Sequence, residues 1–310
     1  MTATVPGVSV VMPAFNVAEF LDESIPSILN QTYADLELIV VDDGSTDGSA
    51  EIVCRYQSGD VRVRLLSLEH RGFFNIAAGV AAARAPLVAR MDADDVARPD
   101  RLAVQVVWMA RTGVDICGSF ATAFGADATE LWFPETHEGI GREFLFRCAM
   151  LDPSVVVRRE VLLANPYSEQ ASFRDYELWT RLAATHTLAN VPEPLMRYRI
   201  HERQLHTVQK EKFGADFRRY RFRHFQNLYP NRSTSEYLAL ARVSDNLPAL
   251  NLATLEQAGE WLVELADGRS RRMRQAMRQR WQATCTLSSG LGPEVEVLRN
   301  GYLVRFGAAD

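Results

Sequence analysis

The sequence predicts an α/β fold in which a mostly parallel sheet is flanked by helices. In the first 120 residues, short apolar runs alternate with stretches whose apolar residues recur at helical spacing, which is typical of a parallel sheet with helices on both faces. Several of these runs are apolar almost without interruption, as in strands that are buried on both faces. With 310 residues, of which 47% are hydrophobic and 24% charged, the chain can bury a sizeable core.

The expected elements of this part follow one another as strand and helix. The strands are expected at residues 8–13, 36–41, 61–66, 86–91 and 115–120. The helices between them are expected at residues 16–31, 47–57, 73–85 and 99–110. For the first helix we expect Asn16 as the N-cap, because Glu19 stands three residues later, the spacing of a capping box.

Beyond residue 120 the alternation becomes less regular, and the chain ends in a helical extension. We expect helices at residues 138–150 and 175–186, and a strand at residues 154–159. From about residue 207 the pattern is mainly helical. We therefore expect one domain over residues 1–205 and a mainly helical, basic region over residues 206–310.

Cysteine use and hydropathy indicate a protein of the cytoplasm. The four cysteines, which are Cys54, Cys117, Cys148 and Cys285, are far apart and form no CxxC pair, so neither a disulfide framework nor a zinc cluster is indicated. No apolar run approaches the roughly 20 residues of a membrane span, and the N-terminus does not resemble a signal sequence. We expect a cytoplasmic location, with contact to the inner face of the membrane as a further option.

Charge is distributed unevenly along the chain. Residues 1–196 hold 15 Lys and Arg against 27 Asp and Glu, whereas residues 197–310 hold 19 against 12. In residues 269–281, six arginines accompany Met273, Met277 and Trp281, which recur at four-residue steps. This stripe is either core packing or one face of a basic amphipathic helix on an anionic membrane surface. No nucleic-acid-reading module accompanies the arginines, so we expect no nucleic-acid partner.

A dense group of carboxylates follows the fourth expected strand. It consists of Asp92, Asp94, Asp95 and Asp100, all within nine positions. Polar segments also follow the first and second strands, at residues 13–16 and 42–49. Because ligands of open parallel sheets bind outside the carboxyl ends of the strands, we expect these three segments to form one site.

The spacing of Asp92 and Asp94 suits a diphosphate that is bound through a divalent cation. If the segment is extended, the two carboxylates point the same way, and a hard cation between them and phosphate oxygens offsets their repulsion. Such oxygen ligands favour Mn²⁺ or Mg²⁺. Neither a Gly-x-Gly-x-x-Gly segment nor a P-loop occurs, so the sequence indicates that a metal ion holds the phosphates.

Five segments together resemble the GT-A glycosyltransferases of family 2. They cover residues 8–16, 36–49, 89–102, 173–182 and 198–201, and so run from Val8 to about His201. The resemblance implies a GT-A, Rossmann-like catalytic domain over residues 1–205 that binds a nucleotide-sugar. It also implies roles for individual residues. The residues assigned to the nucleotide are Pro13, Ala14, Phe15, Asp43, Arg71, Asp92 and Ala93, with Asp43 reading the edge of the base, commonly uracil.

The resemblance also implies a metal site and a catalytic base. Asp94 and Asp92 match the metal-binding carboxylates, while Asp95 matches a supporting or helix-capping group. His201 matches a metal ligand or phosphate contact, and a purely structural histidine is the alternative. Asp175 matches the general base, although it could equally cap its own helix.

The sequence departs from the family pattern at two positions near these groups. Arg174 stands where the family usually has an acidic residue, and the arginine could lower the pKa of Asp175. Asp152 stands where the family often has a histidine, and we expect it either to contact the acceptor or to cap a turn.

The function implied is an inverting, metal-dependent transfer of a sugar. The donor would be a nucleoside diphosphate sugar, most often a UDP-sugar. The acceptor would be a hydroxyl of a glycan or of a lipid-linked oligosaccharide in bacterial cell-envelope synthesis. The alternatives are a nucleotide-sugar-binding protein without turnover and a sugar nucleotidyltransferase. The second would be expected to have a glycine-rich basic loop after the first strand, which residues 13–20 lack.

Overall fold

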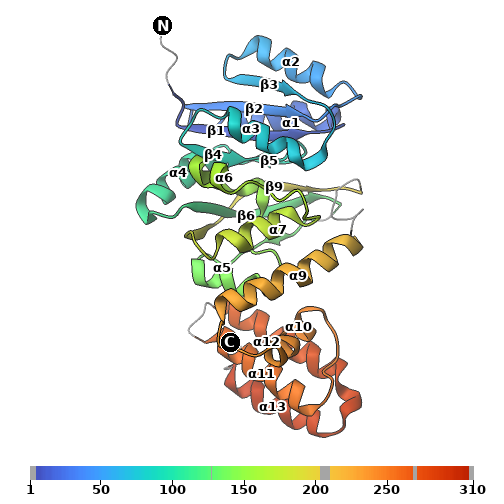
Figure 1. Cartoon of the computed structure of the whole chain (residues 1–310). Helices are drawn as coiled ribbons and strands as arrows, with labels where there is room; N and C mark the ends of the chain where they lie inside the picture. The colour runs from blue at the N-terminus through green and yellow to red at the C-terminus, as the bar shows by residue number, and fades with distance from the viewer. Residues whose placement is uncertain (1–4, 127, 203–209, 268–270, 307–310) are drawn as a thin grey trace. The chain divides into compact units, whose positions relative to one another are not determined.

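The computed structural model describes residues 5–126, 128–202, 210–267 and 271–306, without the side chains of residues 73–74 and 210–213. The chain divides into two compact units (Figure 1). The first comprises Met1–Ile140 and Ala149–Phe217, and the second comprises Gly141–Cys148 and Arg218–Asp310. The boundary expected between residues 205 and 206 lies outside the described residues.

The first unit is built on a sheet that, in the described part of the chain, has nine strands in the order β3-β2-β1-β4-β8-β6-β9-β5, with β7 paired to β6. The strands are β1 (Val8–Ala14), β2 (Leu36–Asp42), β3 (Val63–Ser67), β4 (Leu87–Arg90), β5 (Val96–Ala97), β6 (Ile116–Gly125), β7 (Glu130–Leu131), β8 (Val156–Arg158) and β9 (Leu188–Ile200). β3, β2, β1 and β4 are parallel neighbours, whereas β8 is antiparallel to both β4 and β6. The strands expected in the first 120 residues and at residues 154–159 are therefore confirmed.

Helices cover both faces of the parallel part of this sheet. The helices of the first unit are α1 (Ala18–Leu29), α2 (Ser49–Gly59), α3 (Ile76–Ala82), α4 (Arg101–Thr112), α5 (His137–Glu143), α6 (Arg159–Ala164) and α7 (Arg174–Leu182). Leu21 and Ile25 of α1 join the core formed by Val10 of β1 and Leu38 of β2. On the other face, α3 approaches Val11 and Val41, which lie one and three residues after Val10 and Leu38 and therefore point to the opposite side of the sheet. Two covered faces explain why β1 and β2 are almost wholly apolar.

The start of α1 differs from the expectation for Asn16. The helix begins at Ala18 with Val17 as its N-cap, and Asn16 has a positive φ of 52°. The side-chain oxygen of Asn16 instead accepts a hydrogen bond from the backbone N–H of Thr46 at 2.9 Å. The first N–H of α1, from Ala18, is bound by the carboxylate of Asp47 at 2.9 Å. The cap thus comes from the segment after β2, which local spacing could not indicate.

Two further expectations needed correction. The helix expected at residues 138–150 is short, because α5 ends at Glu143, and two of its residues, Gly139 and Gly141, are poor helix formers. The long strand β9 was not among the expected elements, and it contains Pro192 and Pro194, which are uncommon inside strands. A register shift of β9 against β6 accommodates the prolines, as is common at β-bulges.

The second unit is helical in its described part. It contains the end of α9 (Lys210–Leu228), then α10 (Thr234–Ser244), α11 (Leu252–Ala266), α12 (Arg271–Leu287) and α13 (Glu294–Arg305). Met273, Met277 and Trp281 of α12 are buried in its core, together with Trp261 and Tyr302. The Met and Trp stripe is therefore core packing and does not form a membrane-facing surface.

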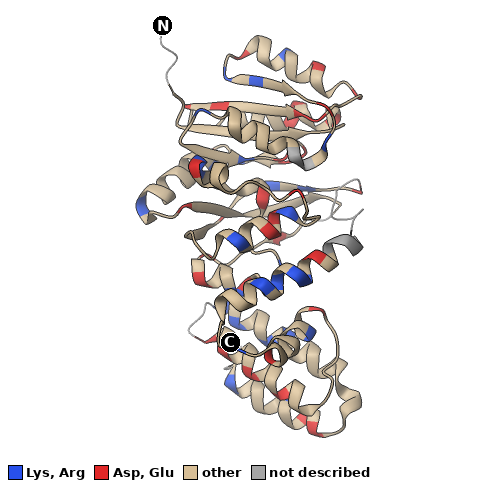
Figure 2. Cartoon of the chain, viewed as in Figure 1, with Lys and Arg blue, Asp and Glu red and all other residues tan. Residues whose placement is uncertain are grey.

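The basic residues of this part lie mainly on the outside of helices. Figure 2 shows Lys and Arg along α9, and Arg271, Arg272 and Arg274 of α12 are exposed. Whether these arginines meet an anionic membrane surface stays a prediction. The side chain of Phe213 and the residue Arg269 lie outside the described part of the chain. Across the described ranges, no helix combines the length and apolar character that a bilayer span requires.

Two helical glycines provide a test of how closely α3 packs on the sheet. A Cβ at Gly79 would lie 2.6 Å from Val11 Cγ1 and 2.7 Å from Val41 Cγ2, whereas a Cβ at Gly301 of α13 would meet nothing within 4 Å. We expect Gly79→Ala to lower the free energy of unfolding by about 1–3 kcal/mol through overpacking. Gly301→Ala should raise it by about 0.5–1 kcal/mol through helix propensity. Urea unfolding measures both, and equal stabilisation by the two variants would contradict the close packing.

Candidate active site

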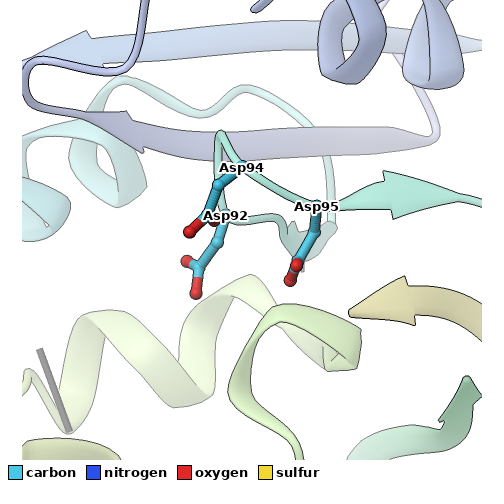
Figure 3. A group of neighbouring side chains, drawn as sticks. All are labelled: Asp92, Asp94 and Asp95. Atoms are coloured by element: carbon cyan, nitrogen blue, oxygen red, sulfur yellow. The ribbon is translucent and has the colours of Figure 1, made fainter. Parts of the chain in front are cut away.

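The acidic segment after β4 is a turn and not an extended strand. The backbone N–H of Asp95 lies 3.3 Å from the carbonyl of Asp92, which closes the turn. Carboxylate oxygens of Asp92, Asp94 and Asp95 all lie within 4.8 Å of one another. Figure 3 shows the three side chains leaving the turn toward the same side. The turn thus gathers three carboxylates where the spacing of the first two had suggested a pair.

Asp95 has a larger part in this cluster than the sequence indicated. It is fully buried and does not cap a helix, because the N-cap of α4 is Asp100. Its Oδ1 accepts the backbone N–H of Arg199 at 2.8 Å, while its Oδ2 has no hydrogen-bond partner among the described residues. A buried carboxylate oxygen without a partner beside two other carboxylates is a fitting ligand for a hard divalent cation. The donor set therefore suits Mn²⁺ or Mg²⁺.

The raised pKa values of two carboxyl groups in the turn also favour a bound cation. Burial raises the pKa of Asp92 to about 7, with Asp94 and Asp152 adding to the effect and Arg90 opposing it. Burial, Asp94 and Asp92 likewise raise the pKa of Asp95 well above its ordinary value. Both carboxyl groups are thus costly to ionise together, and a bound cation would offset that cost.

The end of β9 faces this turn with basic side chains. His201 Nε2 lies 2.9 Å from Asp94 Oδ2, which is the contact expected if both groups approach one ion. Arg199 donates to the carbonyl of Asp94 at 2.7 Å and stacks over the ring of Phe124 at 4.4 Å. Arg199 of β9 therefore binds the backbone of the turn, and His201, directly after β9, binds the side chain of Asp94.

Asp175 lies at the start of α7, on the side of the site toward Asp152. The N-cap of α7 is Phe173, so Asp175 occupies the first turn and does not cap the helix. Burial, followed by the charges of Asp152 and Asp92, raises the pKa of Asp175 to about 7. The lowering that Arg174 could have caused is not seen. A carboxylate with such a pKa suits a general base near neutral pH.

Most of the residues predicted to bind the nucleotide lie at the ends of β1, which pairs with β4, and of β2, which pairs with β1. Ala14 is buried at the end of β1, and its carbonyl accepts the backbone N–H of Asp43 at 2.9 Å. Phe15 follows, 44% exposed, and its ring stacks on His70 with centroids 4.1 Å apart. Pro13, like Ala14, is part of β1. An exposed aromatic pair at this edge could support a nucleobase.

Asp43 is enclosed by the segment that follows β3, and its predicted contact with the base stays a prediction. Its two oxygens accept the backbone N–H groups of Arg71 at 2.8 Å and Gly72 at 2.9 Å, a short bond from Asn75, and a contact from His70 Nδ1 at 2.8 Å. Asp43 is only 5% exposed. In this structure the carboxylate therefore holds the segment after β3 in place beside the site.

Three further residues that the sequence singled out are Arg71, Ala93 and Asp152. The guanidinium of Arg71 is largely exposed and lies 3.8 Å from Glu169, so its contribution to the cluster around Asp43 is its backbone N–H. Ala93 is buried within the acidic turn. Asp152, expected to contact an acceptor or cap a turn, instead forms a buried ion pair with Arg90 at 3.1 Å.

Comparison with known proteins identifies the family. The family model described as Glycosyl transferase family 2 matches residues 9–160. An uncharacterised glycosyltransferase of Haemophilus influenzae is 32% identical over 66% of this chain and 68% of that protein. The chain belongs to glycosyltransferase family 2. The O-antigen biosynthesis glycosyltransferase WbnJ of Escherichia coli is 31% identical over 63% of this chain and 80% of that protein.

Solved structures of GT-A glycosyltransferases share the fold. S. aureus TarS 1–349, crystallised in complex with UDP-GlcNAc, has a TM-score of 0.62 and 16% identity, and covers 96% of this chain and 89% of that chain. The mannosyltransferase PcManGT from Pyrobaculum calidifontis, in complex with GDP-Man and Mn²⁺, has a TM-score of 0.54 and 18% identity, and covers 98% and 86%. At these identities the likeness supports the GT-A fold alone.

Several residues of this family 2 site were not found from the sequence. Arg197 and Arg199 share one face of β9 because they alternate along a strand, and both lie near Glu23 of α1, whereas His201, which was predicted, follows the strand. That alternation was the available signal, and the two prolines concealed it. His70 and Arg90 carried no signal, because their roles depend on partners that are distant in the chain.

We expect Asp94→Asn and Asp95→Asn each to weaken Mn²⁺ binding by at least about tenfold, because each removes a charged oxygen from the cluster. Asp100→Asn is the matched control, since Asp100 belongs to the same segment but pairs with Arg98 and has a side chain that is 45% exposed. Electron paramagnetic resonance of free Mn²⁺ measures the affinity. Equal weakening by all three substitutions would show that the cluster is not the metal site.

Proposed function

We propose that this family 2 member is an inverting glycosyltransferase that moves a sugar from a nucleoside diphosphate sugar, most often a UDP-sugar, to an acceptor hydroxyl. The observation that carries the proposal is the cluster of three carboxylates in the acidic turn, the charge of which reaches Asp175. The charge of Asp92 in that turn contributes to the raised pKa of Asp175. The pKa of Tyr198 on β9 is raised first by burial and then by the charges of Asp95, Asp92, Asp94 and Asp175. The acidic turn and Asp175 therefore both act on the same tyrosine.

The chemistry follows from where these groups lie. Asp175 accepts the proton of the acceptor hydroxyl as the hydroxyl attacks the anomeric carbon, and one base is enough for a single displacement with inversion. Asp94, Asp92, Asp95 and His201 would hold the divalent cation, which when bound supplies positive charge to the diphosphate leaving group. No covalent intermediate between sugar and protein is needed.

The donor class is supported by the nucleotide side of the site. Phe15 and His70 offer a stacked aromatic surface, and Asp43 fixes the adjacent segment. Proteins of the same fold have been solved with UDP-GlcNAc and with GDP-Man, which supports a nucleoside diphosphate sugar without deciding the base. We propose UDP because the residues at this edge resemble those that bind uridine in the family.

The acceptor is proposed from the relatives. WbnJ acts in O-antigen biosynthesis by name, and it matches 63% of this chain. We propose that the acceptor is likewise a growing cell-envelope glycan, free or lipid-linked.

Asp175→Asn should separate catalysis from binding. We expect kcat for nucleotide release in the presence of acceptor to fall by about 10²–10⁴-fold, because the base is lost. The dissociation constant for UDP with Mn²⁺ should stay within about twofold, since Asp175 does not hold the nucleotide. The anomeric configuration of the product, measured by NMR, should be opposite to that of the donor. Full activity of the variant, or a retained configuration, would refute the proposed mechanism.

The pH dependence of the reaction should show an acid limb near pH 7. Burial raises the pKa of Asp175 to about 7, and the charged groups that face it are Asp152 before β8 and Asp92 after β4, with Tyr198 on β9. A base must be deprotonated to act, so kcat/KM should fall about tenfold per pH unit below that pKa and level off above it. Measurement of kcat/KM between pH 5 and 9 tests this, and a flat profile would exclude Asp175 as the titrating base.

A further inference from the structure

The guanidinium of Arg90 lies beneath the acidic turn and has no contact with solvent. Arg90 is the last residue of β4 and is 0% exposed. Its Nη1 donates to the carbonyl of Val11 in β1 at 2.9 Å, and its Nη2 reaches Asp92 Oδ1 at 3.2 Å. A buried charge is stable only when its donors are bound, so the position of this side chain is set by its partners.

Asp152 is the strongest of these partners. Its Oδ2 accepts from both Nε and Nη2 of Arg90 at 3.1 Å, and the carboxylate is only 7% exposed. Burial alone would lower the pKa of Arg90, but the charge of Asp152 raises it above its ordinary value, so the guanidinium remains charged. The fork of an arginine can hold both carboxylates and a carbonyl at once, which a lysine cannot.

Tyr167 connects this pair to the element that bears Asp175. Its hydroxyl donates to the other oxygen of Asp152, Oδ1, at 2.8 Å. Its ring packs edge-on against Trp179 of α7, with centroids 6.3 Å apart. Burial and the charge of Asp152 raise the pKa of Tyr167 well above its ordinary value, so the phenol keeps the proton that it donates.

We propose that Arg90, Asp152 and Tyr167 form a positioning network that holds the carboxylate of Asp92 in the donor site and ties it to α7. The chain runs from Tyr167 through Asp152 and Arg90 to Asp92, and each link is a hydrogen bond or ion pair of 2.8–3.2 Å. Asp152 is therefore a positioning residue for the nucleotide end of the reaction. None of the three network residues needs to touch the substrate.

The network also accounts for the departure at position 152. A histidine there could not supply a second full negative charge to Arg90, whose other carboxylate, Asp92, is needed in the donor site. With Asp152 present, Asp152 neutralises Arg90 more than Asp92 does, so Asp92, which Arg90 contacts at Oδ1, stays available to the ligand. This inference rests on the proposed donor site.

Two substitutions of nearly equal shape test the network. Asp152→Asn removes the charge that neutralises Arg90, so Arg90 should withdraw Asp92 into a closer pair. We expect the dissociation constant for UDP in the presence of Mn²⁺ to rise about tenfold. Tyr167→Phe removes the hydroxyl that donates to the Asp152 carboxylate and should raise the dissociation constant about two- to fivefold. The double variant should weaken binding by less than the product of the two effects, because both act through one chain of contacts.

Glu37→Gln is the matched control. Glu37 is a carboxylate of the same sheet that is 1% exposed and pairs with Arg64 and Arg84, both at about 2.8–2.9 Å, near the start of β2 and away from the site. Its substitution should lower the melting temperature and leave UDP affinity unchanged. A merely structural role for Asp152 would give the same result as this control.

A second readout follows from the charge of Asp152. That charge, after burial, is the largest contribution raising the pKa of Asp175. Asp152→Asn should therefore move the acid limb of kcat/KM to lower pH, whereas Glu37→Gln should leave it in place. Unchanged UDP affinity and an unchanged acid limb in Asp152→Asn would overturn the network. If the wild-type protein binds neither UDP nor GDP by calorimetry with Mn²⁺, the proposed donor site fails, and the network fails with it.

Discussion

Repulsion between the carboxylates of the turn after β4 is the constraint around which the site is organised. Asp92, Asp94 and Asp95 are held within 4.8 Å of one another in a largely buried place, where like charges interact strongly. The surrounding basic groups, which are Arg90, Arg101, Arg199 and His201, bind the backbone or one oxygen of the turn and leave other oxygens to the ligand. The arrangement becomes balanced only when a cation is added, and a diphosphate can then bind.

The neighbouring strand ends are joined by contacts that are distant in sequence. The turn after β1 and the segment after β2 bind each other through Asn16 with Thr46 and Asp47 with Ala18, and Asp43 in turn binds the segment after β3. Each of these side chains satisfies backbone N–H groups at the carboxyl edge of the sheet, where donors would otherwise lack partners. This edge of the sheet is therefore ordered by the protein's own contacts, so a ligand that binds there would require less ordering.

Residue patterns could predict the parallel strands, the order of the helices between them and the place of the acidic turn, because all three depend on local periodicity. They could not predict that Asn16 leaves the cap of α1 to Asp47, because that choice depends on a contact 29 residues away. β9 was hidden for a related reason, since a bulge permits two prolines that local rules exclude from a strand. Asp95 was undervalued because an extended Asp-x-Asp would turn it away from the pair, whereas a turn brings it in.

The two departures from the family pattern, Arg174 and Asp152, bring charges of opposite sign. Replacing an acidic residue before the base by Arg174 adds positive charge on the chain near α7, and replacing a histidine by Asp152 adds negative charge close to Asp175. Arg174 does not appear among the groups that set the pKa of Asp175, whereas Asp152 does. Burial, and then the charge of Asp152 in η2 (Asp152–Ser154), thus keep the pKa of Asp175 raised. Because Asp152 is also bound to Arg90, the charge that supports the base and the charge that orients Asp92 are the same.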